Sequence, residues 1–594
     1  MTRMPTDTKR FTKAKKVLKK TFGFDSFRPT QKKAIASVLS GKDTFVLMPT
    51  GGGKSLCYQI PALVFEGTTI VVSPLIALMK DQVDSLVANG VNARYLNSSM
   101  ELAEQQEVLD AFKSGLLDLV YVSAERLLSP EFLRVLKQYP PSLFAIDEAH
   151  CISSWGHDFR PDYTKLSQLK TTFPTVPIIA LTATADTVTR SDILSQLELR
   201  SPSEFTDSFD RPNISLSVLP AQKRMQKITS FLSDKEGQSG ILYCLTRKQT
   251  EKIAKKLQQL GLSAVSYHAG LSSAERSRIQ KSFVRDRTPI ICATIAFGMG
   301  IDKSNVRWVI HYNMPKNIEG YYQELGRAGR DSAPAEALLF YTYADVEMIR
   351  KFFIDTTQGA LQLGKLERMK EYSEGVICRR KMLLRYFDEE YDDDCGNCDV
   401  CENPYPTLDG TKVVHQTLKV VSTLQKKGHV STKELITVML TKSDKVGYAS
   451  WQFYFAQMKN LGYIQVDFSN DLALTITKKG RECLHQKEKV ALVTLDAFIE
   501  RQEQLGKSKG ITPKKDTKEY YKNELFEKLR ELRAELAASQ GIAAYMVFSD
   551  ATLLEMAHEK PSTKKEMLNV SGVGEVKWER YGEQFIAALA TLSE

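Results

Sequence analysis

Residues 43–55 read DTFVLMPTGGGKS, an apolar run that leads directly into three glycines, a lysine and a serine. In such a loop backbone N–H groups turn inward around phosphate oxygens, the lysine reaches the outer phosphates, and the serine hydroxyl can hold magnesium. Met48 stands where the general GxxxxGKS pattern has its first glycine. A glycine turn with an incidental lysine is the alternative, which the preceding apolar run disfavours. The predicted nucleotide-binding residues of this loop are Thr50, Gly51, Gly52, Gly53, Lys54 and Ser55.

Apolar runs alternate with helical patterns on both sides of residue 207. The runs before it include TTIVVSP, LVYVSAE, LFAIDEAH and PIIALTATA, and those after it include GILYCLT, IICATIAF, VRWVIHYN and EALLFYT. Continuous β-branched runs between amphipathic helices predict parallel strands buried on both faces. The sequence therefore predicts an α/β fold with two tandem lobes. Ligands of such sheets bind beyond the carboxyl ends of the strands.

One of these runs, AIDEAH, ends on the acidic pair Asp147 and Glu148. A carboxylate at this place can hold magnesium through water, and its neighbour can act as general base on the attacking water. Ser55 and Asp147 are therefore the predicted magnesium ligands, and Lys54, Asp147 and Glu148 are predicted to be catalytic. Adjacent acids are also common on surfaces, but their position at the end of a strand favours the catalytic interpretation.

Composition adds little about function. The chain has 594 residues, more than one hydrophobic core usually organises, and its 42% apolar and 26% charged fractions are ordinary. Most of the formal net charge of +10 comes from residues 1–20, an arm that either contacts DNA or is a solvated helix face. No apolar run is long enough for a bilayer, and no signal-peptide core is present. We expect a cytoplasmic protein without a membrane partner.

Four cysteines form a cluster, because Cys378 is followed by CGNCDVC with Cys395, Cys398 and Cys401. Four thiolates at this spacing suit tetrahedral zinc in a closed, structural site. A redox CxxC pair is the alternative, and the overlapping third and fourth cysteines count against it. The helical run ICRRKMLLRYF is expected to attach this module to the second lobe. The remaining cysteines, expected as small core residues, are Cys57, Cys151, Cys244, Cys292 and Cys483.

The order of these motifs resembles the RecQ family of DNA helicases from near residue 12 to the C-terminus. Further matching segments are SPLIALMKDQV, YVSAERL, LTATA, FDRPN, YHAGLS, ATIAFGMGIDK and QELGRAGRD. In YVSAERL, Ala124 stands where the family usually has proline. The resemblance implies that both lobes are RecA-like and that the activity is ATP-dependent helicase activity.

The resemblance also implies roles for residues at the ATP site. In FGFDSFRPTQ, Gln31 would pair with the adenine edge while Phe24 and Arg28 sandwich the ring. Phe24 stands where other members often have tyrosine. Arg327 and Arg330 of the second lobe would reach the phosphates of ATP bound by the first. Such an arginine can be worth about 10³ to 10⁵ in rate, so hydrolysis would require closure of the cleft.

The loop after the acidic pair, CISSWGHDFRPDY, is rich in aromatic and basic side chains. Flat faces of this kind can stack on unpaired bases, at about 1 to 3 kcal/mol per base for an aromatic. The resemblance implies that this loop makes ATP hydrolysis depend on single-stranded DNA. Packing of Trp155 and Phe159 into the lobe interface is the alternative. The predicted DNA-contacting and coupling residues here are His150, Trp155, His157, Phe159 and Arg160.

Residues 408–484 are predicted to form a winged helix, with two strands around a polar turn at Asn470. By resemblance this wing would meet duplex DNA at a fork, although simple scaffolding is the alternative and the stretch TKSDKVGYASWQFY is shorter than the family's usual connection. Residues 523–594 resemble the HRDC domain, a small helical domain shared by RecQ proteins and ribonuclease D. Its glycines 572 and 574 either turn the backbone toward a DNA phosphate near Lys577 or cap helices.

The sequence thus predicts an ATP-dependent DNA helicase that moves 3′ to 5′ on single-stranded DNA and unwinds forked duplexes in recombination and repair. The direction and the pathway are implied only by the resemblance. The expected cofactors are ATP, Mg²⁺ and Zn²⁺, the expected state is a monomer, and a single-stranded DNA-binding protein is an open candidate partner. The alternatives are a translocase that does not separate strands, an ATP-gated DNA-binding scaffold and an RNA helicase. The expected divisions are 1–206 (first lobe), 207–345 (second lobe), 346–407 (zinc module), 408–484 (winged helix), 485–522 (linker) and 523–594 (HRDC-like domain).

Overall fold

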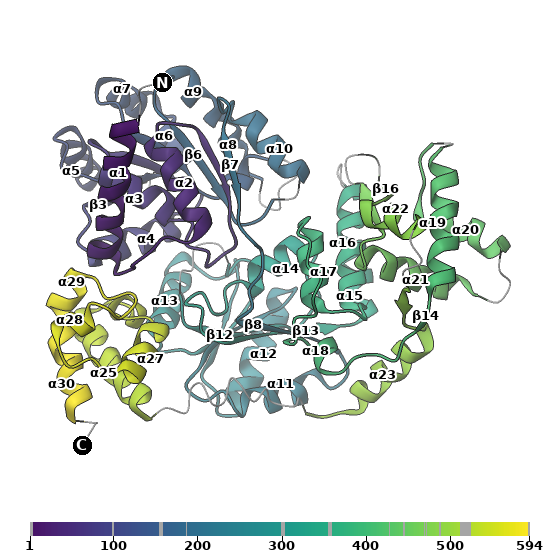
Figure 1. Ribbon diagram of the computed structural model, residues 1–594. Helices are drawn as coiled ribbons and strands as arrows, with labels where there is room; N and C mark the ends of the chain where they lie inside the picture. The colour runs from purple at the N-terminus through teal and green to yellow at the C-terminus, as the bar shows by residue number, and fades with distance from the viewer. Residues whose placement is uncertain are drawn as a thin grey trace.

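Two sheet-containing lobes, a zinc module with a further helical unit, and a C-terminal helical domain make up the chain (Figure 1). No described helix combines the length and apolarity needed to cross a membrane. The computed structural model describes residues 4–97, 100–153, 159–185, 187–298, 303–353, 359–426, 428–442, 446–467, 470, 472–485, 489–510 and 524–591.

The first lobe has a parallel sheet of seven strands in the described residues, in the order β3-β4-β2-β5-β6-β1-β7. Both faces are buried, since Phe45 and Val46 of one strand belong to apolar clusters on opposite sides. The strands are β1 Thr44–Leu47, β2 Thr69–Val72, β3 Ala93–Leu96, β4 Leu119–Val122, β5 Leu143–Ile146, β6 Ile178–Thr182 and β7 Ser203–Thr206. The longer helices are α1 Met4–Val17, α2 Pro29–Leu39, α3 Leu56–Val64, α4 Ile76–Ala88, α5 Leu102–Lys113, α7 Pro130–Gln138 and α10 Thr187–Gln196.

Strand order places the predicted motifs together. Strands β1 and β5 both pair in parallel with β6, with Phe45 opposite Ala180 and Ala145 opposite Ile179. Their carboxyl ends therefore share one edge of the sheet, and the loops that follow carry Lys54 and the acidic pair. This is the edge at which ligands of open parallel sheets bind.

The second lobe repeats this architecture with six described parallel strands in the order β10-β11-β9-β12-β13-β8. Trp308 packs directly over Gly240 on the neighbouring strand, where any larger residue would collide with the indole. The strands are β8 Ile214–Pro220, β9 Ser239–Tyr243, β10 Ala264–Tyr267, β11 Ile290–Ala293, β12 Val306–His311 and β13 Ala335–Tyr341. Its helices are α11 Arg224–Leu232, α12 Arg247–Gln259, α13 Ser273–Val284 and α14 Ile318–Leu325.

Helices dominate the region after the second lobe. A separate core around Trp451 and Phe455 holds the helices and the small hairpin of the predicted winged helix. The expected linker, 485–522, contains a helix, α23, that packs against β8. The elements are α15 Tyr343–Arg350, α16 Gly359–Ser373, α17 Arg379–Tyr386, α18 Asp399–Glu402, β14 Leu408–Asp409, α19 Thr411–Gln425, α20 Thr432–Lys442, α21 Tyr448–Asn460, β15 Ile464–Asp467, β16 Ala473–Ile476, α22 Lys478–His485, β17 Ala491–Leu492 and α23 Leu495–Lys507.

The C-terminal domain is a bundle of helices with its own apolar core around Phe548 and Phe585. It lies beside both lobes, seen in yellow below the first lobe and next to the second (Figure 1). Its elements are α25 Glu524–Gln540, α26 Ala544–Val547, α27 Asp550–Glu559, α28 Lys564–Met567, α29 Glu575–Lys577 and α30 Glu583–Thr591.

Candidate active site

A cavity of about 290 Å³ lies between the two lobes at the carboxyl edge of the first sheet. Both lobes line it, so residues more than 250 positions apart in the chain face one space. The lining residues named by the sequence analysis are Thr50, Gly51, Gly53, Lys54, Ser55, Asp147, Glu148, His150, Arg327 and Arg330.

The phosphate loop has the backbone shape that its glycines allow. Gly51 and Gly53 have φ angles of 81° and 79°, in the left-handed region that favours glycine. Met48 instead continues the strand, donating its N–H to the oxygen of Thr182 over 3.0 Å, so this position has no need of the glycine of the general pattern. Lys54 Nζ donates to Met48 O at 3.1 Å, and burial lowers the pKa of Lys54 although the two nearby carboxylates oppose the shift.

The acidic pair closes β5 as expected. Asp147 N donates to Val72 O at 2.9 Å, which continues the ladder between β5 and β2. Burial first, and then the Glu148 carboxylate, raise the pKa of Asp147 to about 7, while Lys54 opposes the shift. Glu148 has a φ angle of 48°, unusual for a residue with a side chain. Two acids of different environment thus lie beside the phosphate loop.

His150 is buried beside the acidic pair. Its Nδ1 lies 2.9 Å from Thr182 Oγ1 and 3.3 Å from a carboxylate oxygen of Glu148. The ring is 1% exposed, so it does not offer a face to a DNA base. It instead joins Glu148 to the LTATA segment, a link that the sequence analysis did not identify.

Two arginines of the second lobe reach the same cavity. Arg327 is buried, and Arg330 follows on the same loop. A side chain added at Gly51 would lie 3.4 Å from the Arg330 Cα, so this loop packs directly against the phosphate loop. The positions predicted for two phosphate-contacting arginines are therefore brought to the predicted ATP site.

Arg211 was quoted within FDRPN but given no role by the sequence analysis. Its guanidinium donates to Thr50 O at 2.6 Å, and to Ala328 O and Gly329 O at 3.0 and 2.7 Å. It therefore links the phosphate loop of one lobe to the arginine-bearing loop of the other. The sequence could have indicated this role of Arg211, because an arginine in the segment that joins two lobes is placed to contact both.

The segment expected to read adenine is bonded to the phosphate loop. Gln31 Nε2 donates to the oxygens of Gly52 and Gly53, each at 3.2 Å, while Gln31 Oε1 accepts from Arg28 N at 3.0 Å. Arg28 also donates to Gly51 O at 3.2 Å. Phe24 is 41% exposed, which leaves a ring face open. The amide that the resemblance assigns to adenine thus lies at the glycines of the loop.

The aromatic-rich loop is only partly within the described residues. Trp155 and His157 lie outside them. Phe159 is exposed, so it is not packed into the lobe interface. Arg160 donates from its guanidinium to Pro74 O at 2.7 Å, and its backbone N donates to Cys151 O at 2.8 Å.

The four cysteines of the predicted zinc site come together. Their sulfur atoms all lie within 4.8 Å of one another. Backbone N–H groups point at these sulfurs, for example Arg379 N to Cys398 Sγ and Cys395 N to Cys378 Sγ, each at 3.4 Å. Such donors stabilise thiolates, the form that binds zinc. The residues present fit the metal.

Helix α17 attaches the zinc module to the second lobe, as expected. Its Arg379 forms a two-pronged ion pair with Asp399, at 2.9 and 3.0 Å, and Asp399 accepts from Val218 N of β8. The neighbouring Arg380 contacts Asp210 at 2.6 Å, in the segment between the lobes. The cluster is therefore continuous with the edge of the second sheet.

The predicted DNA contacts in the last two units differ in exposure. Asn470 is exposed at the turn of the β15–β16 hairpin, and Leu472, two positions later, packs toward Gly364 of α16. Lys577 lies with its Nζ 5.9 Å from the centre of the Phe548 ring, and burial lowers its pKa to about 8. Gly572 N donates to Gly23 O at 3.2 Å, so this glycine loop faces the first lobe.

Comparison with known proteins gives the class first. Residues 28–192 match the family model for DEAD/DEAH box helicases, and residues 223–332 match the helicase conserved C-terminal domain. Fold, cavity and matches together define a two-lobed, ATP-using helicase. Residues 343–402 further match the RecQ zinc-binding model, and residues 522–589 match the HRDC domain.

Full-length relatives then give the family. The chain is 44% identical to the ATP-dependent DNA helicase RecQ of Pasteurella multocida, covering 96% of this chain and 92% of that protein. It is 43% identical to that of Haemophilus influenzae, covering 96% and 95%, and 38% identical to that of Bacillus subtilis, covering 97% and 98%. The chain belongs to the RecQ family of DNA helicases, and its four-cysteine cluster is the zinc site of that family.

Proposed function

We propose that this protein, an ATP-dependent DNA helicase, moves 3′ to 5′ along single-stranded DNA and unwinds duplexes in recombination and repair. The observation that carries the ATPase part is the shared cavity, where Arg327 and Arg330 of the second lobe face Lys54 and the acidic pair of the first. An ATPase site split between two lobes is completed only when they approach. Binding and hydrolysis can therefore drive the relative movement of the lobes.

The residues predicted to bind nucleotide and to catalyse hydrolysis at this cavity have the following proposed tasks. The loop from Thr50 to Gly53 would hold the phosphates by backbone N–H groups, with Lys54 at the outer phosphates. Ser55 and Asp147 would hold Mg²⁺, which neutralises phosphate charge when bound. Glu148 would orient the attacking water and accept its proton, and Arg327 and Arg330 would stabilise charge that develops on the transferred phosphoryl group.

DNA is proposed to reach this site through the aromatic-rich loop. Phe159 is exposed for stacking, and Trp155 and His157 belong to the same loop. His150 lies between that loop and Glu148, so a shift of the loop when a base binds would be felt at the catalytic carboxylate. Its proposed role is coupling, not base contact.

The remaining proposals concern the substrate and the setting. Forked duplex would be met by the unit 408–484 near Asn470, and Lys577 of the C-terminal domain is a further DNA contact once that domain moves away from the first lobe. We propose a monomer of the six divisions given above, open to a single-stranded DNA-binding protein as partner. Thiolate zinc ligands and a DNA substrate support a cytoplasmic setting, where thiols stay reduced.

A translocase that leaves strands paired is the second candidate. Leu472 at the hairpin turn packs toward Gly364, which would keep the turn from acting as a wedge. The two candidates differ in the products they form from DNA, although both hydrolyse ATP.

The test uses two short duplexes, one with a 3′ and one with a 5′ single-stranded tail, together with DNA-stimulated ATPase assays. Opening of only the 3′-tailed duplex, lost in Lys54→Ala, is the expected result. Stimulated hydrolysis with neither duplex opened would instead establish the translocase. Opening from the 5′ tail would overturn the proposed direction.

A further inference from the structure

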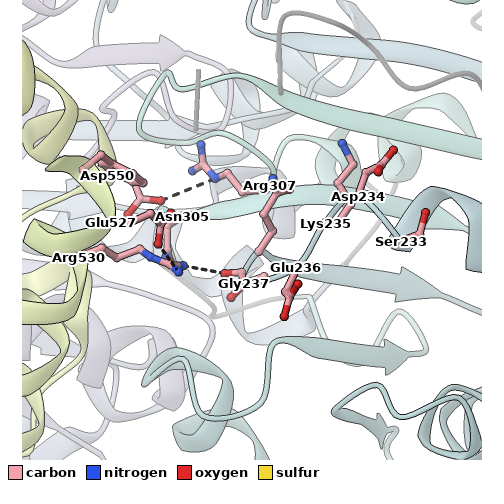
Figure 2. A pocket seen from close by; sticks show the side chains of 13 residues that line it. Ser233, Asp234, Lys235, Glu236, Gly237, Asn305, Arg307, Glu527, Arg530 and Asp550 are labelled. Atoms are coloured by element: carbon pink, nitrogen blue, oxygen red, sulfur yellow. Dashed lines mark hydrogen bonds and ion pairs between the residues drawn. The ribbon is translucent and has the colours of Figure 1, made fainter. Parts of the chain in front are cut away.

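The C-terminal domain contacts both lobes at once. On the first lobe, Lys19 Nζ donates to Leu568 O at 2.7 Å and Arg580 donates to Ala88 O at 3.2 Å. On the second lobe, Arg530 donates to Gly237 O at 2.8 Å, beside a cavity of about 330 Å³ between the two units (Figure 2). The domain is therefore positioned to influence how the lobes are held.

Four buried side chains of alternating charge cross the boundary with the second lobe. Arg533 lies 2.7 Å from Asp550, Asp550 lies 4.0 Å from Arg307, and Arg307 donates to both oxygens of Asp331 at 2.7 Å. Figure 2 shows Asp550 of α27 facing Arg307 of β12. None of the four side chains is more than 7% exposed. Water therefore screens these charges little.

This chain of charges ends next to the ATP cavity. Asp331 directly follows Arg330, and its carboxylate also accepts from Ala333 N at 3.2 Å, which fixes the turn after the arginine. Arg330 itself lines the cavity. Because the two residues are joined by one peptide bond, a shift of Asp331 moves the backbone of Arg330.

We propose that Asp550 is a positioning residue for ATP hydrolysis, which acts through Arg307 and Asp331 on the arginine at 330. The proposal rests on the proposed role of Arg330. Arg307 is shared between two carboxylates, one from its own lobe and one from the C-terminal domain. Removing the charge of Asp550 takes one of these two carboxylates from Arg307, which keeps its hydrogen bonds to Asp331 and to Ser304 O. Buried charges rearrange when a charged partner is lost. The loop that carries Arg330 then loses its fixed geometry.

The test compares three variants of the full chain in DNA-stimulated ATPase assays. D550N keeps the side-chain shape and removes the charge, so kcat should fall roughly two- to thirtyfold, the range of coupling carried by such networks. The KM for ATP should stay unchanged, because the arginine acts on the transition state. D550E keeps the charge and should recover most of kcat. Arg530→Ala removes a different contact with the same lobe and should leave kcat unchanged.

A second comparison separates positioning from docking. D550N in an R330A background should cause no further loss, because its effect passes through Arg330. Three outcomes would each overturn the proposal. D550N could keep the full kcat, or it could cause an equal further loss in the R330A background. D550N and Arg530→Ala could also lose equal activity while the small-angle scattering envelope expands. Normal hydrolysis by R330A alone would instead refute the proposed role of that arginine, so the two failures are distinguishable.

Discussion

Arg211 donates a hydrogen bond to the backbone oxygen of Thr50, 2.6 Å away, although Thr50 belongs to the first lobe and Arg211 to the segment that leads into the second. The same guanidinium holds the oxygens of Ala328 and Gly329. One side chain therefore ties the phosphate loop to the loop that presents Arg330. The link uses backbone oxygens, so it depends on the shape of both loops and not on their side chains.

Arg211→Ala should slow DNA-stimulated ATP hydrolysis. A hydrogen bond to a charged group contributes about 1.5 to 3 kcal/mol, so loss of one such bond from the closed arrangement predicts a roughly ten- to a hundredfold lower kcat. Steady-state ATPase assays with saturating DNA measure this. Arg200→Ala is the control, because Arg200 is bonded to a backbone oxygen within the first lobe only. Equal activity of the two variants would contradict a role for Arg211 between the lobes.

Trp155→Ala should retain ATP binding and lose the stimulation of hydrolysis by single-stranded DNA. Loss of the indole removes a stacking face worth about 1 to 3 kcal/mol per base and the means of moving the acidic pair. Fluorescent-nucleotide binding and ATPase assays with and without DNA check both parts. Tyr139→Ala, which removes an exposed aromatic side chain elsewhere in the same lobe, should behave as the unmodified protein. Full stimulation in Trp155→Ala would end the coupling role.

Cys398→Ser should lose zinc and stability together. Cys398 forms a backbone bridge with Leu216 of β8, so collapse of the cluster disturbs the edge of the second sheet. We expect less than one zinc per chain by elemental analysis. The Tm should fall by more than ~2 to 4 °C, the shift that a loss of about 1 kcal/mol in folding free energy causes in a domain of about 150 to 250 residues. Cys483→Ser, a buried thiol outside the cluster, should keep its zinc. A soluble Cys398→Ser protein with one zinc per chain would refute this assignment.

Gly23→Ala should release the C-terminal domain from the first lobe. Gly23 has a φ angle of 74°, and an added Cβ would lie 2.5 Å from the carbonyl carbon of Val573. Gly41→Ala is the matched control, because its φ angle is 79° and nothing lies within 4 Å of an added Cβ. Both variants carry a backbone cost of about 1 to 2 kcal/mol for a side chain in the left-handed region, but only Gly23→Ala adds the collision. Small-angle scattering should show expansion for Gly23→Ala alone, and identical profiles would argue against this docking.

Much of the first lobe's site could be predicted because it is local in sequence. The phosphate loop and Asp147 each follow an apolar strand, and parallel strands bring their ends to one edge. The zinc ligands could also be predicted from the sequence, because the spacing of the four cysteines is typical of a zinc site. Helix α23 inside the expected linker had a detectable signal, because Thr494 caps its first turn through the N–H of Ala497.

Other parts of the site depend on contacts that no local pattern encodes. Arg211 hydrogen-bonds Thr50 and Gly329, and Asp550 pairs with Arg307. These partners are far apart in the chain, and the periodicity of apolar residues does not predict such contacts. His150 was predicted among the DNA-contacting and coupling residues, and its burial depends on how the LTATA segment folds over it. Burial of a polar side chain is decided by packing, which spacing alone does not report.

The bond between Lys19 and Leu568 joins residues 549 positions apart. At typical synthesis rates of about 5 to 20 residues per second, roughly 30 to 110 s separate the appearance of the two partners. During that interval the first lobe must stay folded with this surface uncovered by its final neighbour. A nascent chain can therefore form its phosphate loop long before the C-terminal domain exists to cover the surface around Lys19, and shortened chains should expose this surface permanently.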